Sequence, residues 1–227
     1  MSKKTEQKHK GICVLCGKEE YLTREHVPPK NLFSKPRPKN TITAWTCKPC
    51  NASYSQDEEY FRIYIAAGAS PDSDCGRLWK EKVENSTFSR SPALRQKLSD
   101  GMDVIQQYHK LNPLKDFDGK PIPDELIPYA LPLESDRICR VIKKIIRCLY
   151  FKHFKFVLSP EIEISISTEP LTEVEVEKIV IEHKGFVGNK VDNLFIYWFD
   201  QQEKDGSIDW ILLFQGGFKY FRATIKM

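Results

Sequence analysis

The sequence lacks any long hydrophobic run, and no segment approaches the roughly 18 apolar residues that a membrane-spanning helix needs. The first ten residues are polar and basic without an apolar core behind them, so we expect no secretory signal and a cytoplasmic location. The sequence also lacks a strong excess of charge of either sign, because it contains 35 Lys and Arg and 31 Asp and Glu. With 227 residues, 41% of them hydrophobic, the chain is long enough to fold without a disulfide scaffold.

The small net charge of +4 is unevenly distributed along the chain. Residues 1–50 contain eleven Lys and Arg but four Asp and Glu, a net charge of +7, so the other 177 residues carry −3. A basic segment on a nearly neutral body is typical of a surface that faces a polyanion. A lysine-rich, solvated tail would explain part of the same excess.

Four of the seven cysteines fall in two pairs with a two-residue spacer, Cys13 with Cys16 and Cys47 with Cys50. Two such pairs favour a tetrahedral Zn²⁺ site, because the spacer lets a tight turn direct both sulfurs at one ion. Four thiolates close the coordination shell, so we expect a structural zinc. A redox C-x-x-C is the alternative, but it leaves the second pair unexplained. The other cysteines are interpreted as small buried side chains: Cys75, Cys139 and Cys148.

We expect an α+β fold whose N-terminal module is bound to zinc and whose C-terminal part is an antiparallel sheet with helices. The expected parts are a disordered tail, a zinc module, a turn-rich helical linker region and an α+β domain, at residues 1–10, 11–68, 69–135 and 136–227. In the zinc module, two short strands precede a helix that begins with the second cysteine pair; they are predicted at 21–27, 42–46 and 51–67.

After the zinc module, the sequence pattern predicts mainly helices up to about residue 156 and mainly strands in the C-terminal part. Helices are expected at 75–84, 92–109, 136–156 and 173–184. Strands are expected at 161–167, 194–199, 208–214 and 218–225, with their aromatic side chains packed in the core or at a dimer edge. The helix at 136–156 also carries a basic stripe that either tracks phosphates or forms a solvated face: Arg137, Arg140, Lys144 and Arg147.

An acid–histidine pair, Glu25-His26, lies between the cysteine pairs, and Asn51 directly follows the second pair. With Asn40 seven residues before Cys47, this pattern resembles the HNH (His-Me finger, ββα-metal) endonucleases with a four-cysteine zinc site, including the endonuclease VII-like enzymes and a group of bacterial HNH proteins. The resemblance covers about residues 11–65, and nothing in residues 70–227 resembles a known family. It implies a treble-clef-like ββα-metal module at the N-terminus.

The resemblance implies a catalytic site separate from the zinc. Glu25 and Asn51 would be oxygen ligands of one divalent ion, most simply Mg²⁺. His26 would be the general base that takes a proton from the attacking water, because a histidine pKa near 6.5 leaves the ring largely neutral at pH 7. Phosphodiester hydrolysis would leave 5′-phosphate and 3′-hydroxyl ends. Asn40 would orient the loop and the histidine, with Asn31 as the reserve choice.

Two features of this site need explanation. Adjacent residues on a regular strand face opposite sides, so we expect a bend near Val27-Pro28-Pro29 to bring Glu25 and His26 together. Many HNH enzymes also place a metal ligand one turn after the first helix ligand, where this chain has Ser55. Nearby carboxylates either assist the ion or are solvated charges and helix-dipole partners: Asp57 and Glu58.

Basic residues flank the expected site, and as a cluster they favour contact with the phosphates of DNA: Arg24, Lys30, Lys35, Arg37 and Lys48. The sequence therefore predicts a metal-dependent DNA endonuclease, and by analogy one that serves in phage defence or restriction. An enzyme that cleaves RNA with the same site, and a non-catalytic zinc module that binds nucleic acid or a protein, are the alternatives. We expect the C-terminal domain to act in targeting or to dock a partner, either a second copy or another protein.

Overall fold

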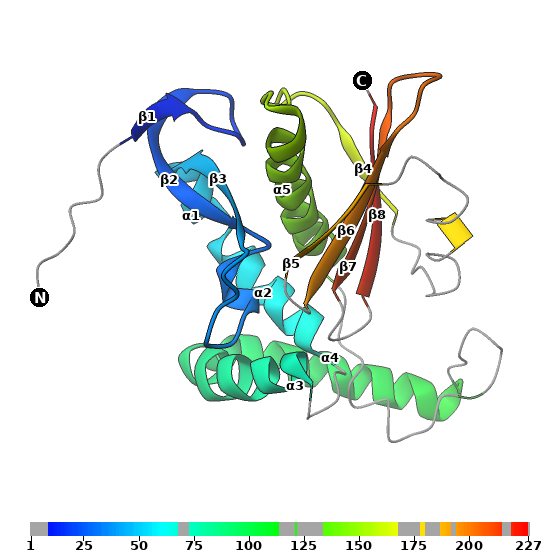
Figure 1. The fold of residues 1–227 in the computed structure, drawn as a ribbon. Helices are drawn as coiled ribbons and strands as arrows, with labels where there is room; N and C mark the ends of the chain where they lie inside the picture. Colours follow the sequence, from blue (N-terminus) through cyan, green and yellow to red (C-terminus); the bar gives the residue numbers. More distant parts are fainter. Residues whose placement is uncertain are drawn as a thin grey trace, which may run out of the picture.

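The computed structural model describes residues 9–67, 73–113, 121, 134–167, 178–179, 187–191, 194–214 and 219–226. It has an α+β fold with a three-stranded and a five-stranded antiparallel sheet. The long helix α5 (Ser135–Phe154) lies between the two sheets (Figure 1). The expected α+β class and the C-terminal antiparallel sheet are thus confirmed. Within the described residues, no helix is long and apolar enough to cross a membrane.

The first sheet has the order β1-β2-β3 and is built from β1 (His9–Ile12), β2 (Glu19–Val27) and β3 (Ile42–Cys47). The second and third strands are those that the sequence predicted. The first begins at His9, inside the segment expected to be a disordered tail, while residues 1–8 lie outside the described residues. Between β1 and β2 the chain reverses in a tight turn in which Gly17, at φ 70°, donates its N–H to the Cys13 carbonyl.

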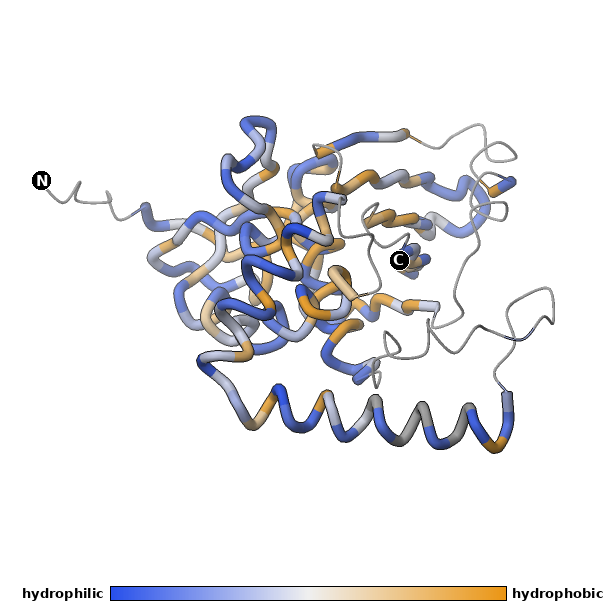
Figure 2. The backbone as a smooth tube through the Cα atoms, turned by 90° about the horizontal axis from the view of Figure 1, so that it is seen from below, coloured by the Kyte–Doolittle hydropathy of each residue, from blue (hydrophilic) through white to orange (hydrophobic). Residues whose placement is uncertain are grey.

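A series of helices follows the first sheet. The helix expected over 51–67 is two helices, α1 (Lys48–Ser53) and α2 (Ser55–Ala66), which meet at Tyr54. Pro49 in the first turn of α1 fits a position where no backbone N–H is needed. The remaining elements of this region are the 3-10 turn η1 (Lys30–Leu32), α3 (Asp74–Leu78), the π-helix η2 (Trp79–Phe88) and α4 (Pro92–Leu111). Figure 2 shows α4 running along one side of the molecule.

The second sheet has the order β4-β8-β7-β6-β5. Its strands are β4 (Ile164–Ile166), β5 (Val187–Val191), β6 (Phe195–Gln201), β7 (Ile208–Phe214) and β8 (Lys219–Ile225). Three expected strands match closely, and the one expected at 161–167 is shorter. The sequence did not predict β5, whose first four residues are exposed and carry no apolar alternation. The helix expected at 173–184 lies outside the described residues except for 178–179, which are helical.

One continuous core joins the two sheets, and it contains buried residues from Cys13 to Ile225. The apolar stripe of α5 packs in it, as do five aromatic side chains of the second sheet: Phe195, Tyr197, Trp210, Phe214 and Phe221. Phe61 of α2 meets Phe214 edge-on, with ring centroids 5.2 Å apart. The interpretation as core residues is confirmed for these five, whereas Trp198 and Tyr220 are half-buried and Phe218 lies outside the described residues. Cys75 and Cys148 are fully buried as expected, whereas Cys139 is half-buried.

The side chains of the basic stripe of α5 bind other parts of the chain, although Arg140 is also exposed to solvent. Arg137 and Arg140 both pair with Asp57 in the first turn of α2, and Lys144 pairs with Glu25 and Glu58. Arg147 donates to four carbonyl groups in the segment that follows α5: Leu158, Ser159, Pro160 and Ile162. The stripe therefore attaches α5 to the first sheet, to α2 and to its own C-terminal connection.

Candidate functional site

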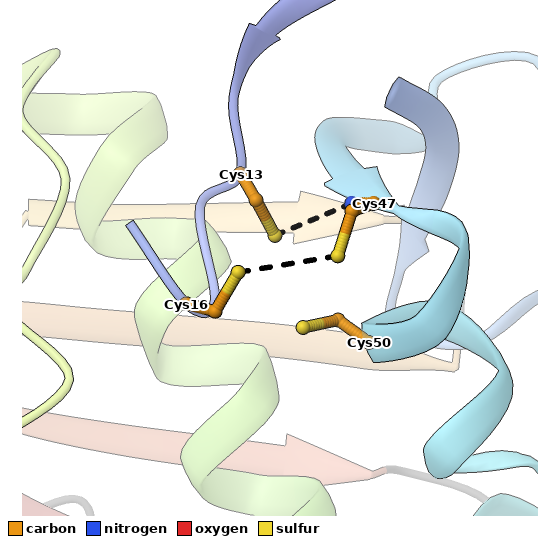
Figure 3. Close-up of side chains that lie close together, drawn as sticks. All are labelled: Cys13, Cys16, Cys47 and Cys50. Carbon is orange, nitrogen blue, oxygen red and sulfur yellow. Dashed lines mark hydrogen bonds between the residues drawn. The ribbon is translucent and has the colours of Figure 1, made fainter. Parts of the chain in front are cut away.

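The four paired cysteines meet at one end of the first sheet, and their side chains converge (Figure 3). Cys13 and Cys16 come from the turn after β1, Cys47 ends β3, and Cys50 lies in α1. All four sulfur atoms lie within 4.8 Å of one another, and those of Cys16 and Cys47 are 3.9 Å apart. A tetrahedral Zn²⁺ with metal–sulfur distances of about 2.3 Å requires separations of about 3.8 Å. The cluster can therefore hold a metal such as zinc, as expected from the spacing.

The surroundings of the sulfurs favour a thiolate at one position first. Burial opposes ionisation of Cys13, but backbone N–H groups, foremost that of Cys47 at 3.2 Å from the sulfur, lower the pKa of its thiol. Burial and the neighbouring cysteine side chains raise the pKa of Cys50. Burial also raises the pKa of Cys47, so the Cys47 and Cys50 thiols resist ionisation, and a bound cation would favour their thiolate forms.

Glu25 belongs to a second polar cluster, which α5 helps to build. Its carboxylate is buried, with 5% of the residue exposed, and Oε1 lies 3.0 Å from Nζ of Lys144. The same ammonium group also pairs with Glu58 of α2. Lys144 is only 1% exposed, and the nearby carboxylates raise the pKa of its ammonium group although burial works against them. The three side chains form a buried carboxylate–ammonium cluster, called here the Lys144 cluster.

His26 lies beside Glu25 in sequence but on the other face of β2. The strand keeps its pairing with β3 through Val27, opposite Ile42, so adjacent side chains alternate across the sheet. The bend that we expected near Val27 does not bring Glu25 and His26 to the same face, because both residues lie within the regular strand, which ends at Val27. The backbone N–H of His26 donates to Glu25 Oε1 at 3.1 Å, so the Glu25 carboxylate folds against the backbone of the next residue. His26 itself is half-buried.

The electrostatics of His26 favour the neutral ring. Burial lowers the pKa of its imidazole, the nearby Lys30 lowers it further, and Arg37 and Arg24 add to the effect. Glu25 works in the opposite direction but is outweighed. All five basic residues that the sequence placed near the site are exposed: Arg24, Lys30, Lys35, Arg37 and Lys48. Three of them are thus close enough to His26 to act on its charge.

The three asparagines of the predicted site lie in different surroundings. Asn51 reaches β2, where its Nδ2 donates to Thr23 Oγ1 at 3.2 Å, and Thr23 shares a face of the strand with Glu25. Asn40 donates to the Lys190 carbonyl of β5 instead. Asn31, the reserve choice, donates to the Glu58 carbonyl of α2, and its own side-chain oxygen is buried without a partner in the described structure.

Sequence reasoning missed Lys144 as a member of this site. The signal was its place in the basic stripe of α5, because the first turn of α2 offers acidic partners: Asp57 and Glu58. Pairing the two helices would have required knowing that they pack together. No known family model, curated protein or solved structure matches the chain, so the site is interpreted from its own geometry.

Proposed function

We propose that the N-terminal part is a zinc-bound, treble-clef-like ββα-metal module and that the chain is a metal-dependent endonuclease acting on DNA. The order of elements supports the module: a cysteine turn, the β2–β3 hairpin, then a helix that carries the last cysteine. The observation that carries the nuclease proposal is the environment of His26. A half-buried histidine with a lowered pKa, next in sequence to a buried carboxylate and close to exposed cations, is suited to proton transfer near a phosphate.

In this proposal each residue has a defined task. His26 takes a proton from the water that attacks the scissile phosphorus, since its ring is neutral at pH 7. Glu25 and Asn51 supply oxygen atoms to one divalent ion, for which carboxylate and amide oxygens are suitable ligands. When bound, that ion would stabilise negative charge on the phosphate and on the leaving oxygen. The nearby cations, Lys30 and Arg37 foremost, hold the backbone of the nucleic acid.

Two observations favour a second candidate, a non-catalytic zinc module that binds nucleic acid or a protein partner. Glu25 is already paired with the ammonium group of Lys144, as a purely structural acid would be. His26 and Glu25 also face opposite sides of a regular strand. Zinc binding by the four cysteines requires neither residue, so this candidate predicts that both can be replaced without loss of function.

The experiment uses the full chain loaded with zinc. Other divalent ions are removed without EDTA, because EDTA would also remove zinc from the cysteine site. Supercoiled plasmid is incubated with this protein in the absence and presence of Mg²⁺, Mn²⁺ or Ni²⁺. We expect the wild type to nick the plasmid only when one of these ions is added. The His26→Ala variant should not nick it, although its zinc content and melting temperature match those of the wild type. His109→Ala is the matched control, since it removes an imidazole from a residue with no proposed role.

Equal inactivity of the wild type and His26→Ala with all three ions would overturn the nuclease proposal and favour the binding module. A labelled RNA of the same sequence, tested in parallel, decides between DNA and RNA as substrate. A role in phage defence or restriction rests on the resemblance of the site residues alone. It predicts that cells carrying the active chain, but not His26→Ala, resist phage infection.

A further inference from the structure

The Lys144 cluster marks a point in the molecule where a cation is held between two carboxylates. Nζ of Lys144 lies 3.0 Å from Glu25 Oε1 and pairs directly with Glu58. The two acids come from different elements, β2 and α2, and the ammonium group reaches both from α5. Two carboxylates that contact the same nitrogen atom must themselves converge. In this structure the cation at the point where they converge is the ammonium group of Lys144.

The charges of the cluster do not balance. Two carboxylates against one ammonium group leave a net charge of −1 at a site where Lys144 and Glu25 have side chains only 2% and 7% exposed. A cation of charge +2 at the same point would neutralise both acids. Oxygen ligands of this kind suit hard divalent ions such as Mg²⁺ and Mn²⁺.

We propose that Glu25 and Glu58 form a two-carboxylate site for a divalent ion and that Lys144 is its internal competitor. Glu58 is then a ligand that the family resemblance does not supply, and it takes the place left open by Ser55. The ammonium group holds the two acids together when no ion is present, and an ion binds only by displacing it. Tyr54, whose ring centroid is 5.1 Å from Nζ, offers the displaced ammonium group a neighbouring aromatic face.

This inference rests on the proposed function in one respect, the role of Glu25 as a metal ligand. It differs from that proposal in its consequence, because it predicts ion binding in the absence of any nucleic acid. An internal lysine at this point also predicts weak binding of ions in the wild type, since the ion must break two buried ion pairs first. Removing the lysine should therefore strengthen ion binding.

The experiment measures Mn²⁺ affinity by isothermal titration calorimetry on the zinc-loaded full chain without nucleic acid. Lys144→Met removes the competitor, and we expect it to bind Mn²⁺ roughly tenfold or more tightly than the wild type, since affinity follows the uncompensated charge of the ligands. Lys143→Met is the matched control, because it removes a half-buried lysine one position earlier on α5. It should bind Mn²⁺ as the wild type does.

A second variant identifies the ligand. In Lys144→Met/Glu58→Gln the gain in Mn²⁺ affinity should disappear, because one carboxylate remains. The proposal is overturned if Lys144→Met binds no more tightly than the wild type, or if the gain survives Glu58→Gln. If Lys144→Met does not fold, Glu58→Gln alone decides, since it keeps the Glu25–Lys144 pair. That single variant should lower the Mn²⁺ affinity of the wild type, and unchanged affinity overturns the proposal.

The outcome is separable from that of the nuclease test. Gain of Mn²⁺ binding in Lys144→Met without any cleavage by the wild type would support the two-carboxylate site and overturn the nuclease proposal. Cleavage that requires His26, together with unchanged Mn²⁺ affinity in Lys144→Met, would support the nuclease proposal and overturn the two-carboxylate site. Zinc content is measured in every sample, so that Mn²⁺ bound at the cysteines is not counted.

Discussion

The cysteine cluster and the Lys144 cluster both contain buried groups that carry or can acquire negative charge, but they are stabilised in different ways. The cysteines crowd four sulfurs within 4.8 Å of one another, and the pKa of Cys50 is raised by burial and by its neighbours. Glu25 and Glu58 instead share an ammonium group that the chain itself supplies. The first cluster can bind an external cation, and we propose that it depends on one for its stability, whereas the second carries its own.

The largest effect is expected from breaking the cysteine cluster. Cys50→Ser removes one thiolate, and a structural zinc site of this type contributes about 10–16 kcal/mol to folding of its module. We expect the variant to lose zinc and to lose the ordered first sheet, measured by metal analysis and by amide hydrogen exchange. Cys139→Ser is the control, because this half-buried cysteine lies on α5 outside the cluster. Loss of zinc without loss of protection in β1–β3 would contradict the dependence on an external cation.

The next effect is expected from removing the internal cation of the second cluster. Lys144→Met leaves two buried carboxylates without their partner, and removal of one member of a buried ion pair costs about 3–5 kcal/mol. We expect a drop of that size in the free energy of unfolding, measured by urea denaturation without divalent ions. Adding Glu58→Gln to this variant should restore part of the loss, because one uncompensated charge disappears. A double variant less stable than Lys144→Met would show that Glu58 stabilises the fold in another way.

The two clusters also differ in how far the sequence predicts them. The cysteine cluster forms between residues 13 and 50, where a tight turn, a hairpin and a helix start bring the four sulfurs together by local geometry. Each of these elements has a clear signal: the two-residue spacers, the alternating strands and Pro49 at the start of α1. For this reason β2, β3 and the convergence of the four cysteines were all predicted from local sequence patterns.

The Lys144 cluster was not predictable in the same way, because it depends on packing between elements far apart in the chain. Lys144 is 86 residues from Glu58, and only the contact between α2 and α5 brings them together. A basic stripe on a helix has the same appearance in sequence whether it faces water, phosphate or another helix. Asn40 illustrates the same limit, since its side chain bonds to Lys190 on β5, a strand without an apolar signal.

A smaller effect is expected at Asp57, a buried carboxylate at the contact between α2 and α5. Asp57 pairs with Arg137 at 3.0 Å and also with Arg140, but both guanidinium groups are partly exposed and keep water as an alternative partner. Asp57→Asn should therefore lower the free energy of unfolding by about 1–3 kcal/mol, less than Lys144→Met does. The measurement is urea denaturation at low and high salt. A loss equal to that of Lys144→Met would show that the exposure of the cation does not set the strength of these ion pairs.

The smallest effect is expected at Lys30, and it tests the charges around His26. Burial and Lys30 lower the pKa of His26, so Lys30→Ala should raise this pKa toward its ordinary value, measured by NMR titration of the imidazole. The native state takes up fewer protons at His26 than the unfolded state does. The stabilising contribution of His26 is therefore complete above the unfolded pKa near 6.5 and is lost as pH falls through the lower folded pKa. Lys30→Ala should reduce this pH dependence by less than about 1 kcal/mol. If the chain is a nuclease, the pH at which cleavage is half-maximal should rise in the same variant, whereas a pKa that stays unchanged would place Lys30 outside the site.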